Sequence, residues 1–64
     1  MRSVKDTRII IEFVHVGSYV KVSAVDPVTL VEVSIVGDPA TSETTLKQTA
    51  LKKLNFVLSK RGLK

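Results

Sequence analysis

The fold is decided by one stretch of the chain, FVHVGSYVKV, at residues 13–22. Runs rich in β-branched and aromatic residues, which are typical of β-strands, flank the pair Gly17-Ser18. A two-residue loop with glycine in its first position indicates a type II′ hairpin, and the loop length fixes the register of the strands. Phe13 is therefore expected opposite Val22.

Outward from this hairpin, the segments with strand composition are residues 8–16, 19–26 and 31–36. At the second connection, Asp26 followed by Pro27 favours a type I turn. A loop of four residues would place Val22 opposite Ile35, and Leu30 where the backbone is left-handed and glycine or asparagine is preferred.

The C-terminal part of the chain predicts a helix over residues 43–61. Thr41, Ser42 and Glu43 supply candidate N-caps and an acidic first turn, and a basic last turn precedes Gly62. Apolar residues recur along one side of this helix, at Leu46, Ala50, Leu51, Leu54, Val57 and Leu58. We expect an α+β fold, a three-stranded antiparallel β-meander followed by one C-terminal α-helix packed on one sheet face (βββα). A single domain would span residues 8–61, between tails at residues 1–7 and 62–64.

Length and composition limit what such a domain can do. The chain has 64 residues, a net charge of +4 and no cysteine. Domains of this size have thin cores, and most are reinforced by disulfides, a metal or a partner subunit. Without cysteines a partner subunit is the expected device, and an enzyme acting alone is not expected. With no apolar leader or spanning segment, the protein is expected to be cytoplasmic.

The sheet face turned away from the helix, called here the open face, is unusually apolar. A solvated face of an antiparallel sheet is mostly polar, so an apolar one indicates association. We predict a small non-enzymatic interaction or scaffolding protein that forms a homodimer through this face, with exposed Phe56 of the helix available to a higher assembly. The candidate self-association residues are Ile10, Glu12, Val14, Val16, Tyr19, Lys21, Val25, Val36 and Phe56.

The residues that could take part in catalysis are not expected to lie close together. His15 is placed on the helix side of the sheet, whereas Ser23 and Ser34 face the other way with Glu12. No catalytic residue, metal site or cofactor is predicted, and His15 is interpreted as structural. The segment 36–42 precedes a helix but lacks a phosphate-binding spacing, so capping is its expected role. An enzyme would need a site shared across a dimer, built from Glu12, Lys21 and Ser23.

The alternative function is nucleic-acid binding through the basic helix. Sheet-reading DNA modules carry arginine and lysine on the sheet, whereas the open face offers Lys21 against two glutamates. The candidate contacts are therefore helical, at Lys47, Lys52, Lys53, Lys60 and Arg61. A solvated helix face explains the same charges without any partner.

Segments 13–27, 32–37 and 50–54, FVHVGSYVKVSAVDP, EVSIVG and ALKKL, resemble a family of very short bacterial proteins of unknown function. The resemblance spans most of the chain. It implies a stand-alone protein of about this length and assigns no activity, cofactor or catalytic residue. Leu30 departs from the pattern, which implies glycine after Thr29.

Overall fold

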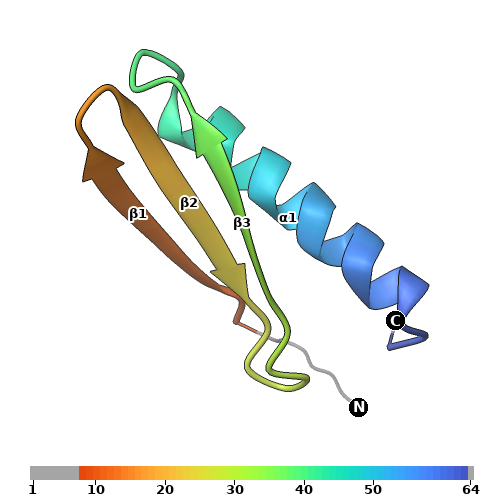
Figure 1. The fold of residues 1–64 in the computed structure, drawn as a ribbon. Helices are drawn as coiled ribbons and strands as arrows, with labels where there is room; N and C mark the ends of the chain where they lie inside the picture. The colour runs from red at the N-terminus through yellow and green to blue at the C-terminus, as the bar shows by residue number, and fades with distance from the viewer. Residues whose placement is uncertain (1–7, 64) are drawn as a thin grey trace.

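The computed structural model describes residues 8–63, which form three strands and one helix in the order β1, β2, β3, α1 (Figure 1). The strands are β1 (Ile10–Val16), β2 (Tyr19–Val25) and β3 (Glu32–Gly37), and the helix is α1 (Glu43–Lys60). The expected βββα fold is confirmed. The predicted N-terminal tail, residues 1–7, lies outside the described residues, as does Lys64.

Both predicted strand registers are confirmed. The sheet is antiparallel with the strand order β1-β2-β3. Phe13 lies opposite Val22, which in turn lies opposite Ile35. The alternation along these strands therefore defines the two faces of the sheet that the sequence predicted.

Each of the two connections contains one residue with a positive φ, glycine in the first and leucine in the second. Gly17 has φ 56°, in the left-handed region that the first position of a type II′ loop requires. Leu30 has φ 65° in the second loop, where its N–H donates to the Asp26 carbonyl at 2.7 Å. The Asp26 carboxylate is buried and accepts the N–H of Val28 at 2.8 Å, so the aspartate folds its own turn.

The helix is capped at both ends by local hydrogen bonds. The Ser42 hydroxyl accepts the N–H of Thr45 at 3.2 Å, which identifies Ser42 as the N-cap. At the other end the helix stops at Lys60, one residue before the predicted end, and Arg61 is the C-cap. Gly62 follows with φ 71°, a left-handed conformation common just past a helix end.

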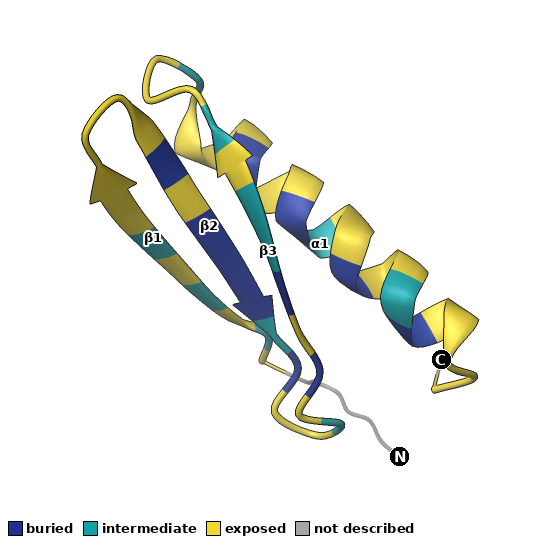
Figure 2. Cartoon of the chain, in the orientation of Figure 1, coloured by how far each residue is buried: buried dark blue, intermediate teal, exposed yellow. Residues whose placement is uncertain are grey.

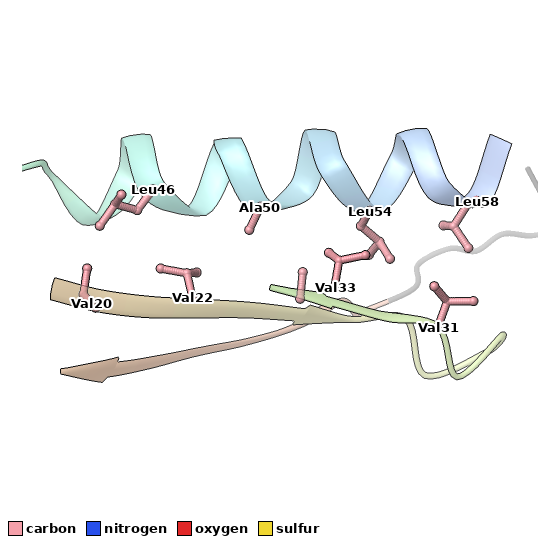
Figure 3. Close-up of a cluster of buried hydrophobic side chains, with 9 residues drawn as sticks. Val20, Val22, Val31, Val33, Leu46, Ala50, Leu54 and Leu58 are labelled. Carbon is pink, nitrogen blue, oxygen red and sulfur yellow. The ribbon is translucent and has the colours of Figure 1, made fainter. Parts of the chain in front are cut away.

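The helix lies diagonally over β2 and β3 and leaves β1 at the far edge of the sheet (Figures 1 and 2). Close approach is possible because Ala24 and Ala50, both fully buried, are small. At the end of β3 a Cβ on Gly37 would collide with the Leu46 side chain, so only glycine fits there without movement. The core between the layers is aliphatic (Figure 3), and consists of Val20, Val22, Ala24, Val31, Val33, Leu46, Ala50, Leu54 and Leu58.

The predicted helix stripe is more buried at its centre than at its flanks. Leu46, Ala50, Leu54 and Leu58 are buried, whereas Leu51 and Val57 are half-buried. On β1 the residues turned toward the helix, Ile11 and Phe13, are also only half-buried. The helix is therefore too narrow to cover the whole sheet, and β1 remains the exposed strand.

Candidate functional site

The open face lies opposite the helix and presents a broad apolar surface to solvent. Its exposed aliphatic and aromatic residues come from all three strands, and they are Ile10, Val14, Val16, Tyr19 and Val36. Val36 is 66% exposed, an unusual amount for a valine in the body of a strand. Val25 is half-buried, while Glu12 and Lys21 are exposed. The register thus places all eight sheet residues of the predicted self-association surface on one face.

A polar row crosses the middle of the open face at Glu12, Ser23 and Ser34. These three residues lie opposite one another across the strands. Ser23 is only 6% exposed although it faces away from the helix, because it sits in the central strand among larger neighbours. The hydroxyls of Ser23 and Ser34 are 3.4 Å apart and form a cross-strand hydrogen bond. This bond uses the O–H of one serine, so a surface that covers the row has to offer an acceptor to the other O–H.

Phe56 lies on the opposite side of the molecule from the open face. It is 62% exposed on the outer side of α1, and the Lys60 ammonium sits 5.8 Å from the centre of its ring. This geometry is a cation–π contact. One flat interface cannot include both Phe56 and the sheet residues, so Phe56 belongs to a separate surface.

The five basic residues predicted as nucleic-acid contacts do not form one face of α1. At about 100° per residue, Lys52, Lys53 and Lys60 project on the same side as Phe56, whereas Lys47 and Arg61 project elsewhere. All five are exposed. Two of them already have partners within the chain, because Lys60 contacts Phe56 and Lys53 donates to the Ser34 carbonyl at 2.7 Å.

The sequence profile of a domain of unknown function, DUF6898, matches residues 6–61. This chain belongs to the DUF6898 family. The match covers the meander and the helix together, so the βββα unit described here corresponds to the family's domain. No curated protein and no solved structure matches the chain.

In this DUF6898 domain His15 does not lie close to the residues with which it could form a catalytic group. It is exposed near the end of β1, and its position in the strand alternation puts it on the helix side, whereas Ser23 faces the open side. Among residues 8–63, histidine and the acidic residues nowhere gather in a group of three that could hold a metal ion. In the same range no helix is long and apolar enough to cross a membrane.

A pocket that the sequence did not predict lies between the start of β1 and the C-terminal half of α1. It has a volume of about 400 Å³, and its lining is Ile9, Asp26, Leu51, Leu54, Asn55, Leu58 and Leu63. Most of this lining is aliphatic. Its carboxylate, Asp26, is already engaged by the backbone N–H of Val28. The pocket therefore has no pair of groups set up for nucleophilic or acid–base chemistry.

Sequence reasoning also missed the contact that Lys53 makes with the outer edge of β3. The Lys53 ammonium reaches from the helix over the strand to the carbonyl of Ser34. Neither residue has a distinctive sequence context, since a lysine in an exposed helical position is ordinarily solvated. Only the diagonal placement of α1 over β2 and β3 brings the two groups together.

Proposed function

We propose that this DUF6898 domain is a small non-enzymatic interaction protein that associates with a second copy of itself through the open face. The observation that carries the proposal is the apolar open face, with five large apolar residues exposed on three regular strands. A monomer gains nothing from exposing these side chains, whereas packing two such faces removes them from water.

Charge on the open face suits a two-fold arrangement. Glu12 and Lys21 lie in adjacent rows on neighbouring strands, and both are exposed. In a two-fold packing of sheet on sheet, Lys21 of each copy can face Glu12 or Glu32 of the other. The hydroxyls of Ser23 and Ser34 share one hydrogen bond, so the second copy has to pair only one of the two O–H groups.

The test uses a charge placed on the open face. Val36→Glu puts a carboxylate at the most exposed of the five large apolar residues of that face, and we expect the solution mass of the assembly to fall by half. Gln48→Glu is the matched control, because it adds the same charge at an exposed helical site. Sedimentation equilibrium across a dilution series measures both variants. A wild-type chain that remains monomeric at all concentrations, or a Val36→Glu variant that keeps the mass of the wild-type assembly, contradicts the proposal.

Nucleic-acid binding is the second candidate, supported by Lys52, Lys53 and Lys60 on one side of α1. Adding a mixed oligonucleotide pool to the same series distinguishes it. If this candidate holds, complexes form at low salt, weaken as salt rises, and weaken further in the double variant Lys52→Glu, Lys53→Glu. The self-association proposal expects no change in mass with oligonucleotide.

A further inference from the structure

The two outer edges of the sheet differ in how they are protected. An edge strand exposes N–H and C=O groups that can pair with another chain, and proteins commonly block such edges with lysine, proline or bulges. On β3 the edge is blocked at its centre, because Lys53 binds the outward carbonyl of Ser34 at 2.7 Å. On β1 the seven residues of the strand contain no lysine or proline, and their pairing with β2 runs without a bulge.

The hydrogen-bonding alternation shows which groups of β1 are available. The residues beside a two-residue hairpin loop, here Val16 and Tyr19, form a hydrogen-bonded pair. Counting back along β1, the backbone N–H and C=O groups of every second residue bond to β2. Those of the residues in between point away from β2, to the outside of the sheet. The outward set is Ile11, Phe13 and His15. The same alternation carried across β2 predicts that Ser34 points outward from β3, and its bond to Lys53 agrees with this.

The side chains at this edge are also incompletely covered. Ile11 and Phe13 point to the helix side of the sheet but are only half-buried, because α1 lies over β2 and β3 (Figure 2). A strand added beside β1 would cover their exposed sides. Among residues 8–63, the β1 edge therefore offers both unpaired backbone groups and unburied apolar surface along one line.

We propose that β1 pairs antiparallel with β1 of a second copy, with the two-fold axis at Phe13, to form a continuous six-stranded sheet. This register is the one that overlaps all residues of both strands, since Phe13 is the midpoint of β1. It aligns the outward residues of the two copies, Ile11 opposite His15 and Phe13 opposite Phe13. The Ile11–His15 pair occurs twice by symmetry, so three pairs with two N–H···O bonds each give about six bonds across the junction.

The chemistry of β1 fits a second copy of this chain. In the Phe13-centred register Glu12 lies opposite Val14 of the second copy, and that copy's Lys21 follows in the same row. No two like charges lie directly opposite each other in this register. Glu12 and the Lys21 of the second copy lie in the same row, with one strand between them. A shift that moves the axis to Glu12 would place the two glutamates face to face. The paired Phe13 rings add a cross-strand aromatic contact.

This interface is distinct from the open face, and the main test is a proline that blocks only the edge. His15 is exposed and its N–H points away from β2, so His15→Pro removes an outward donor without removing a bond to β2. His15→Ala also removes the imidazole but keeps the backbone N–H. We expect His15→Pro to raise the dimer dissociation constant by about tenfold or more, and His15→Ala to leave it close to that of the wild type. Circular dichroism confirms that both variants are folded.

A cysteine at the two-fold axis tests the register, since the chain has no cysteine of its own. Opposite Cα atoms in a hydrogen-bonded antiparallel pair are about 5.5 Å apart, within the range of a disulfide. Phe13→Cys is therefore expected to form a disulfide-linked dimer under mild oxidation, whereas Lys52→Cys on the helix is not. Equal cross-linking of the two variants, or none at Phe13→Cys, overturns the proposed register.

The two proposals fail in different ways. A dimer that survives His15→Pro but is lost in Val36→Glu overturns the edge pairing and leaves the open-face proposal standing. A dimer that survives Val36→Glu but is weakened by His15→Pro, and not by His15→Ala, overturns the open-face proposal and leaves the edge pairing standing. If both interfaces form, the wild type is a tetramer, Val36→Glu and His15→Pro each reduce it to a dimer, and the double variant is a monomer. A wild-type monomer at all concentrations overturns both proposals.

Discussion

At the scale of single residues, Leu30 has the conformation least suited to its side chain. Its φ of 65° lies in the left-handed region, where a residue with a Cβ is disfavoured by about 1–2 kcal/mol. The side chain does not compensate through packing, because it is 77% exposed. The loop instead depends on Asp26, which binds the N–H of Val28 and accepts the N–H of Leu30 on its carbonyl.

Leu30→Gly is therefore expected to stabilise the fold. Relief of the left-handed strain exceeds the added flexibility of glycine in the unfolded chain, for a net gain of about 0.5–1 kcal/mol in the free energy of unfolding. Urea denaturation measures the change. Leu30→Ala keeps the Cβ and is expected to show no comparable gain, so a similar gain in both variants would contradict the explanation.

At the scale of elements, the N-cap of α1 matters for stability because four of the nine core residues lie on this helix. The Ser42 hydroxyl accepts the N–H of Thr45 and donates to the Thr45 hydroxyl at 3.0 Å. The helix contributes Leu46, Ala50, Leu54 and Leu58 to the core, so fraying of its first turn loosens Leu46 first.

Removing that cap should cost stability at one end of the helix. Ser42→Ala is expected to lower the free energy of unfolding by about 1 kcal/mol, because the first-turn N–H loses its acceptor. Ser59→Ala, the same change in the last turn, is expected to have little effect or to stabilise slightly. Thermal unfolding followed by circular dichroism compares them, and equal losses would argue against capping as the cause.

The elements themselves were predictable from the sequence because local rules fix them. The Gly17-Ser18 loop and the four-residue loop after Asp26 each set a register, and the registers place every strand residue on the correct face. Strand and helix ends differ from the prediction by one or two residues, for example at Ile10 and Lys60. Fraying ends depend on single hydrogen bonds that sequence patterns do not specify.

At the scale of the whole molecule, the sequence does not predict the lateral position of the helix on the sheet. The residues of the open face follow from alternation, but which strand α1 leaves uncovered depends on the sizes of side chains in contact. Gly37 accommodates Leu46 at one end, and Ala24 with Ala50 allows close approach in the middle. The protected β3 edge, the exposed β1 edge and the pocket beside Ile9 all result from this placement.

If Lys53 blocks the β3 edge, removing its charge should change how far association proceeds. Lys53→Met keeps an aliphatic chain of similar length but cannot bind the Ser34 carbonyl. Both edges of the sheet are then open, so we expect assemblies larger than those of the wild type, growing with concentration. Lys52→Met is the control at a neighbouring exposed site. Light scattering measures both, and identical size distributions would mean that the Lys53 contact does not limit growth.

The order of the elements along the chain has a kinetic consequence. Each strand pairs with the one that precedes it, and α1 docks last in sequence onto β2 and β3. Short loops bring such neighbours together with little entropy to overcome, so the chain is expected to fold within about milliseconds. The β1 edge is complete once the first hairpin closes, before a second molecule is met. If the chain associates with a second copy as proposed, refolding is expected to show a unimolecular phase followed by a bimolecular one whose rate rises with protein concentration.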